Sequence, residues 1–218
     1  MKGLLVKDFR LLLSQKAYYL AVFLVAIVLV TSTGSPNFVV GYLAMLCMMF
    51  ALSSISYDEF DNGNAFLFCL PISRNGYVRE KYLFAFFLGT GSWLLSFVVA
   101  VVCQMIQTGE CLFLDLFVES AMIVLFFQVL ISFMLPIQFK FGSEKGRMVQ
   151  LAVYGVAFGS VFLGAKLLED LNLNIGEMFS GFVENYMVLF FAFVIAAAIL
   201  LQLLSMKISE RIVEKKEF

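Results

Sequence analysis

Residues 82–106 read YLFAFFLGTGSWLLSFVVAVVCQMI, a run of 25 residues without a single charged side chain. The hydrocarbon core of a bilayer is about 30 Å thick, and a helix needs about 20 mainly apolar residues to cross it. A stretch this long and this apolar therefore predicts a transmembrane helix. Further stretches of the same kind decide how the rest of the chain folds.

Apolar stretches recur along the whole chain. Of the 218 residues, 62% are hydrophobic and only 14% are charged, whereas soluble domains are about 45 to 50% apolar. A water-soluble fold would not hide this much apolar surface, so we expect a single transmembrane domain with an all-α fold. Six spans are predicted, at 17–34, 37–56, 82–106, 116–138, 148–168 and 185–206.

Nearly all positive charges lie on one side of the six predicted spans. Lysines and arginines number 15, and 14 of them precede the first span, follow the sixth, or lie between spans two and three or spans four and five. Only Lys166 falls on the opposite side. Because cationic loops resist translocation, both termini, the long loop 57–81 and the tail 207–218 are predicted to be cytoplasmic. A miscounted span would have scattered these charges over both sides.

Residues 1–16, MKGLLVKDFRLLLSQK, have the pattern of an amphipathic helix. Leucine and phenylalanine side chains gather near one side, and the charged side chains lie elsewhere: Lys2, Lys7, Asp8 and Arg10. Such a helix can lie along the inner membrane surface, with its apolar side in the headgroup region and its basic side chains toward anionic lipid. A plain extension of the first span is the alternative interpretation.

The loop 57–81 contains an apolar island at 65–70, bracketed by charged and turn-forming residues. The island is too short to span a bilayer, and the turn signal at 61–63 before it and Pro71 after it predict a short helix. An apolar patch on a cytoplasmic loop commonly marks a protein interaction site. The alternative is that the island docks onto the inner helix ends of the chain itself.

Polar side chains recur at helical spacing within the predicted spans. Three pairs are candidates for lining a translocation path: Ser92 with Ser96, Gln128 with Ser132, and Gln150 with Tyr154. Serine and glutamine also hold neighbouring spans together through interhelical hydrogen bonds, and this structural role is the alternative. No ionisable residue is expected at mid-membrane depth, which disfavours an ion-coupled carrier.

The sequence offers no catalytic or cofactor-binding machinery. Histidine is absent and the four cysteines form no C-x-x-C pair, so no metal site is expected. The segment 142–147, GSEKGR, lacks the spacing and the Lys-Ser/Thr ending of a phosphate-binding loop. With a net charge of −1, the chain has no basic field to attract nucleic acid. Any ATP that drives this chain must therefore bind another subunit.

Three local patterns, in their order along the predicted spans, resemble the permease subunits of ABC transporters of the ABC-2 family. They are MKGLLVKDF at 1–9, LPISR at 70–74 followed by REKYL at 79–83, and PIQFKFGSEKGR at 136–147. The resemblance extends over essentially the whole chain. It is to the small six-span type that includes bacterial exporters of peptide toxins and antimicrobial peptides.

The resemblance implies a permease of a bacterial cell membrane that dimerises with itself or with a related chain. It also implies two separate ABC ATPase subunits, which bind the ATP and magnesium. The family's amphipathic N-terminal helix corresponds to 1–16, its re-entrant outer segment to about 169–184, and its coupling helix lies between spans two and three. Five residues there would insert into the ATPase cleft: Phe66, Leu67, Leu70, Pro71 and Arg74.

Two functions are compatible with the sequence. The first is the permease of an ATP-driven exporter, which forms the path for an amphipathic or peptide substrate. The second is a membrane anchor or sensor that transports nothing and docks a cytoplasmic partner through the loop 57–81. Both functions use the apolar island, but only the first requires a path across the membrane.

Overall fold

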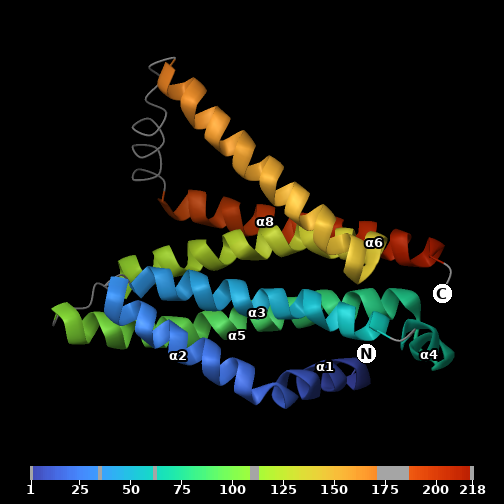
Figure 1. Ribbon diagram of the computed structural model, residues 1–218. Coiled ribbons are helices and arrows are strands. Elements are labelled where there is room, and N and C mark those ends of the chain that lie inside the picture. The colour runs from blue at the N-terminus through green and yellow to red at the C-terminus, as the bar shows by residue number, and fades with distance from the viewer. Residues whose placement is uncertain (1, 34–35, 61–62, 109–112, 171–186, 217–218) are drawn as a thin grey trace.

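The computed structural model describes residues 2–33, 36–60, 63–108, 113–170 and 187–216 (Figure 1). Over these residues the structure is all-α and contains no strand, which confirms the all-α part of the predicted fold class. The helices are α1 (Lys2–Ser14), α2 (Lys16–Thr33), α3 (Pro36–Glu59), α4 (Gly63–Cys69), α5 (Arg74–Thr108), α6 (Phe113–Asp170) and α8 (Met187–Lys215).

Four helical stretches of the described chain are long and apolar enough to cross a membrane: Phe38–Glu59, Arg74–Ile106, Phe113–Ser143 and Leu189–Lys215. They contain or overlap the predicted second, third, fourth and sixth spans. Helix α2 and the far part of α6 occupy the residues predicted as the first and fifth spans, and their membrane crossing stays a prediction. The outer segment expected at about 169–184 lies almost entirely outside the described residues.

Helix α3 forms the centre of the bundle and packs against α2, α5 and α6. Its buried side chains recur every three or four residues, as a helix that buries one stripe requires: Val40, Ala44, Met48, Ala51 and Ile55. Opposite them, α5 contributes Phe84, Ala85 and Leu88, and α6 contributes Ile131, Leu135 and Phe139. Many large apolar side chains point outward from the same helices, which suits a bundle surrounded by lipid.

Both chain ends lie at the same end of the bundle, together with α4 (Figure 1). The long helices run back and forth from this end (Figure 1). Helix α5 begins here at Arg74 rather than at residue 82, the predicted start of the third span. Ser73 caps it, since its hydroxyl accepts a hydrogen bond from the Gly76 amide at 3.1 Å and its carbonyl accepts one from the Tyr77 amide at 3.0 Å.

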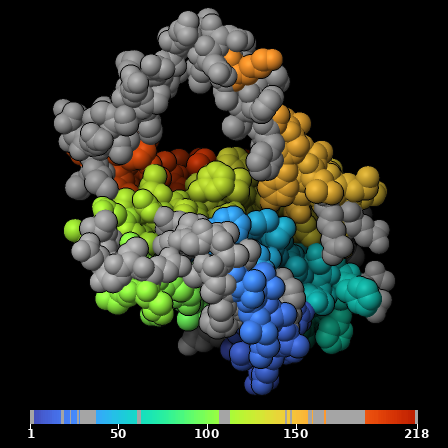
Figure 2. All heavy atoms as spheres, turned by 60° about the vertical axis from the view of Figure 1, so that its left-hand side comes forward, coloured from blue at the N-terminus to red at the C-terminus, as the bar shows by residue number. Residues whose placement is uncertain are grey.

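Helix α6 is broken at one residue. A cytoplasmic loop was expected between the spans 116–138 and 148–168, but helical structure runs through it and only Gly142, at φ 75° and ψ −176°, is non-helical. We call the part before Gly142 the first arm of α6 and the part after it the second arm. The second arm leaves the bundle at an angle (Figure 1), and Figure 2 shows it in gold, apart from α8 in red.

Candidate functional site

The short helix α4 has an inner and an outer side. Leu67 is buried in the core of the bundle, and the ring of Phe68 meets the ring of Tyr77 edge-on at 5.7 Å between centroids. Phe66, at 75% exposure, and Leu70 point away from the bundle, and Pro71 after them is also exposed. The apolar island is thus divided, because one side docks onto the chain itself and the other stays uncovered.

Arg74, expected to contact an ATPase, is bound within the chain. Its Nη1 atom donates to the carbonyl of Glu214 at 2.7 Å and to that of Val213 at 3.4 Å, and Asn75 Nδ2 donates to Glu214 Oε1 at 2.8 Å. The last carbonyls of a helix lack intrahelical partners and carry partial negative charge, so a cation there is favourable. Arg74 therefore fastens the beginning of α5 to the end of α8.

A buried ionic cluster joins α1 to α3 and α5 beside this position. Lys81 of α5 is 0% exposed, and its Nζ atom lies 2.5 Å from Asp8 Oδ2 of α1 and 2.7 Å from Asp58 Oδ2 of α3. The same atom donates to the Ser54 hydroxyl at 3.2 Å. Because charges removed from water must be paired, these contacts stabilise Lys81 inside the bundle. We call Asp8, Asp58, Lys81 and Lys7 the α1 ionic cluster.

Lys7 completes the cluster by binding Asp58 and lying 3.2 Å from Asp8. Burial lowers the pKa of its ammonium group, but the hydrogen bond and charge of Asp58, helped by Asp8, outweigh burial and raise that pKa above 10.5. Lys7 thus faces the bundle, not the anionic lipid expected from the sequence. Glu80 is also buried, and neither carboxylate oxygen has a hydrogen-bond partner among the described residues.

The sequence interpretation missed this cluster. Lys81 was counted as a loop charge and Asp8 as part of the polar side of an amphipathic helix. Two signals were available, since Asp8 is the one acidic residue among the charges of 1–16 and Lys81 directly precedes the charge-free run 82–106. Their pairing is not visible in the sequence, because 73 residues separate them.

The break in α6 is held by α3 and by the end of α8. Glu59 Oε2 accepts a hydrogen bond from the Ser143 amide at 2.6 Å and so caps the second arm of α6. Lys216 Nζ lies 3.4 Å from Glu59 Oε1 and donates to the Phe139 carbonyl at 3.2 Å. A Cβ atom at Gly142 would lie 3.2 Å from Glu59 Oε2. Gly142 is therefore required both for its positive φ and for the close approach of this carboxylate.

The serines predicted to line a path lie inside the bundle. Ser92, Ser96 and Ser132 are buried, and each hydroxyl donates to a carbonyl three or four residues earlier in its own helix. These serines thus have partners without any interhelical bond. In a single chain they line no open path.

The predicted glutamines occupy two different places. Gln128 is buried where α6 meets α5, and a Cβ atom at Gly89 would lie 2.7 Å from its Oε1 atom, so the two helices approach closely there. Gln150, on the second arm of α6, donates to Gln138 Oε1 of the first arm at 3.0 Å. Tyr154, one turn further along, is half-buried. The three predicted pairs therefore do not form one continuous surface within this chain.

A family model described as ABC-2 family transporter protein matches residues 3–214, nearly the whole chain. The match includes the patterns at 70–83 and 136–147 and most of the pattern at 1–9. No curated protein and no solved structure matches the chain.

Proposed function

This chain belongs to the ABC-2 transporter family, and from that premise we propose that it is the membrane-embedded permease subunit of an ATP-driven exporter. The proposed topology has six spans with both termini in the cytoplasm of a bacterial cell. It is supported by the 14 basic residues expected on one side and by the position of both termini at one end of the bundle (Figure 1).

The uncovered side of α4 carries the proposal that an ATPase docks at this end. Phe66 lies on α4, a helix of seven residues that is too short to span a bilayer, and Leu70 and Pro71 follow directly after it; all three are exposed. We call these three residues the ATPase-docking surface. Exposed apolar surface of this kind favours a protein partner, and in our proposal that partner is an ABC ATPase subunit that binds ATP and magnesium. Leu67 and Arg74, which serve the chain internally, are left out of the surface.

The second arm of α6 supports pairing with a second permease subunit. Its apolar side chains Met148, Leu151 and Val156 are exposed, and the arm stands apart from the bundle that would otherwise cover them. In the proposed dimer the two second arms face each other, and the substrate crosses between the subunits. An amphipathic molecule or peptide suits such a path, because its walls are apolar with a few polar groups such as Tyr154.

The contacts of α4 suggest how ATPase closure would reach the membrane helices. A push on Phe66 passes to the core through Leu67 and to α5 through the rings of Phe68 and Tyr77. Arg74 binds α5 to α8, and the α1 ionic cluster binds α5 to α1 and α3. In this proposal these four helices move together. Gly142 is then the position at which the second arm of α6 changes its angle to the rest.

Transport measured in liposomes tests the proposal. The chain is purified natively, and the ABC ATPase that co-purifies with it is identified. ATP-dependent export of an amphipathic peptide is then followed in vesicles that contain the complex. Phe66→Asp is expected to abolish both the co-purification and the export. Phe60→Asp is the matched control, because Phe60 is 72% exposed but lies outside α4. A complex that binds its ATPase and moves no substrate would favour the membrane anchor or sensor instead.

A further inference from the structure

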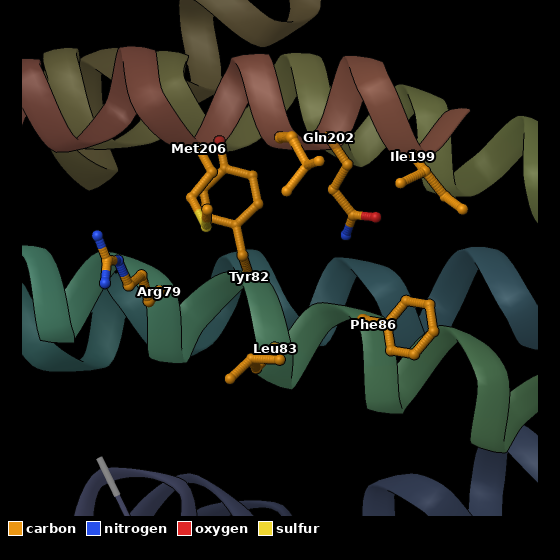
Figure 3. Close-up of a pocket in the computed structure, with 8 residues that line it drawn as sticks. Arg79, Tyr82, Leu83, Phe86, Ile199, Gln202 and Met206 are labelled. Carbon is orange, nitrogen blue, oxygen red and sulfur yellow. The ribbon is translucent and has the colours of Figure 1, made fainter. Parts of the chain in front are cut away.

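A groove of about 400 Å³ lies between α5 and α8 (Figure 3). Its walls are mainly apolar and include Leu83, Phe86, Ile199, Leu203 and Met206. Figure 3 shows Met206, Gln202 and Ile199 on α8 opposite Tyr82, Leu83 and Phe86 on α5, with Arg79 at one end. The groove is separate from the ATPase-docking surface on α4.

Hydrogen bonds below the groove fix the separation of its two helices. The hydroxyl of Tyr82 in α5 lies 2.6 Å from the Ser205 hydroxyl and 2.8 Å from the Ser209 hydroxyl of α8. Ser205 in turn donates to the carbonyl of Ser132 in α6. The side chains of Tyr82, Ser205 and Ser209 join α5 to α8, and the carbonyl of Ser132 adds α6, so the network ties three helices together. The groove is therefore preformed and does not depend on a bound molecule for its shape.

The groove is open along its length to the surroundings of the bundle. Leu83, Phe86 and Leu203 are all between 42% and 52% exposed. An apolar groove in a bilayer would hold water poorly, and an empty groove would lose the dispersion contacts of its walls. Acyl chains of the surrounding lipid are the molecules available to fill it.

Positive charge gathers at one end of this groove, the end nearest the termini. Arg79 is exposed and pairs with Glu210 at 2.6 Å. Lys207, also exposed, follows Leu203 by four residues and so lies about one turn further along nearly the same side of α8. Arg211 is exposed one turn beyond it. Counted together with Glu210 and Glu214, the three cations Arg79, Lys207 and Arg211 leave a net charge of +1 at this end. Basic pockets between helices on the cytoplasmic side of a membrane attract anionic headgroups.

We propose that this groove binds one anionic phospholipid of the inner leaflet. An acyl chain lies between Leu83, Phe86 and Leu203, and the phosphate lies at Arg79 and Lys207. The position in the inner leaflet rests on the orientation given under the proposed function. Lipid binding by the isolated chain does not depend on transport, so either proposal can fail without the other.

Lipid retention by the full chain in detergent tests the headgroup. The purified chain is incubated with phosphatidylglycerol or with phosphatidylcholine of identical acyl chains, and bound lipid is counted by native mass spectrometry. Phosphatidylglycerol is expected to be preferred. Arg79→Gln is expected to reduce that preference about five-fold, which corresponds to about 1 kcal/mol for one cation near an anionic headgroup.

Glu210→Gln separates lipid binding from a purely structural role of Arg79. Both substitutions break the same ion pair, but Glu210→Gln also removes the carboxylate that competes with the phosphate. It is therefore expected to keep or increase the preference for phosphatidylglycerol. An equal loss in both variants, or equal retention of the two lipids by the unaltered chain, overturns the proposal.

Steric filling tests the groove itself. Leu203→Trp fills it and is expected to reduce the retention of both lipids. Leu204→Trp is the matched control, since Leu204 is 50% exposed against 52% for Leu203 but does not line the groove. Equal retention by the two tryptophan variants would place the bound lipid elsewhere and overturn the proposal. If Leu203→Trp changed dimerisation and left lipid retention unaltered, the proposal would also be overturned, because the groove would then be an interface between copies of the chain.

Discussion

Lys81 Nζ of α5 lies 2.5 Å from Asp8 Oδ2 of α1, and the two side chains are 0% and 1% exposed. This ion pair fixes the N-terminal helix to the bundle at the end where the ATPase is proposed to dock. An interfacial helix held only by lipid would be free to change its angle, whereas α1 is bound to α5 and α3 through Lys81.

Replacing Lys81 with methionine is expected to lower the free energy of unfolding by about 3 to 5 kcal/mol, because it leaves Asp8 and Asp58 buried near each other without their shared cation. The measurement is denaturant unfolding of the purified chain in mixed micelles. Lys215→Met is the control, since Lys215 is exposed. Equal stability of the two variants would mean that the cluster is hydrated and not buried.

Substitutions at neighbouring positions of α4 are expected to act differently. Leu67→Asp buries a charge in the core and should destabilise the chain even when no ATPase is present. Phe66→Asp changes an exposed residue and should alter the free energy of unfolding by less than about 0.5 kcal/mol. Thermal unfolding of each variant in the absence of partner proteins measures this difference. Similar losses in both variants would contradict the two-sided arrangement of α4.

Alanine at Gly142 is expected to destabilise the chain by about 1 to 2 kcal/mol, because its φ is positive and its Cβ would meet Glu59. Alanine at Gly155, in the same arm and with nothing within 4 Å of the added Cβ, should be neutral or stabilising by up to about 1 kcal/mol. Comparative denaturant unfolding provides the check. If Gly142→Ala were as stable as Gly155→Ala, the break in α6 would lie at another residue.

Removal of the Tyr82 hydroxyl should loosen the contact between α5 and α8. Tyr82→Phe leaves Ser205 and Ser209 without this partner and is expected to cost about 1 to 3 kcal/mol. Tyr57→Phe removes an exposed hydroxyl that accepts a bond from Gln15 and should cost under about 0.5 kcal/mol. Unfolding curves of the two variants compare them directly. A cost at Tyr57 equal to that at Tyr82 would argue against the buried network.

The spans were predictable where the sequence has long charge-free runs. The run 82–106 and the stretches at 37–56, 116–138 and 185–206 all coincide with helices apolar enough to cross a membrane. The start of α5 was not predictable. Its first turns contain Arg79, Glu80 and Lys81, which suggest a loop until the partners of Lys81 on α1 and α3 are known.

The candidate site was predictable only in part, for a related reason. The family resemblance predicted that five residues would contact a partner: Phe66, Leu67, Leu70, Pro71 and Arg74. Of these, Phe66, Leu70 and Pro71 are exposed, whereas Leu67 is buried. The burial of Leu67 could not be foreseen, because tertiary packing decides which residue of the island faces the core. The partners of Arg74 were equally hidden, because they are backbone carbonyls of α8 and carbonyls have no sequence signature.

The contact between Arg74 and the last turn of α8 has a consequence for the order of synthesis. A ribosome makes Arg74 long before Val213 and Glu214, and Glu59 likewise precedes Lys216 by most of the chain. This end of the bundle is thus completed only when translation is nearly finished. A chain halted before Val213 would lack the carbonyls that hold Arg74, so the proposed docking end would stay incomplete until translation has passed Glu214.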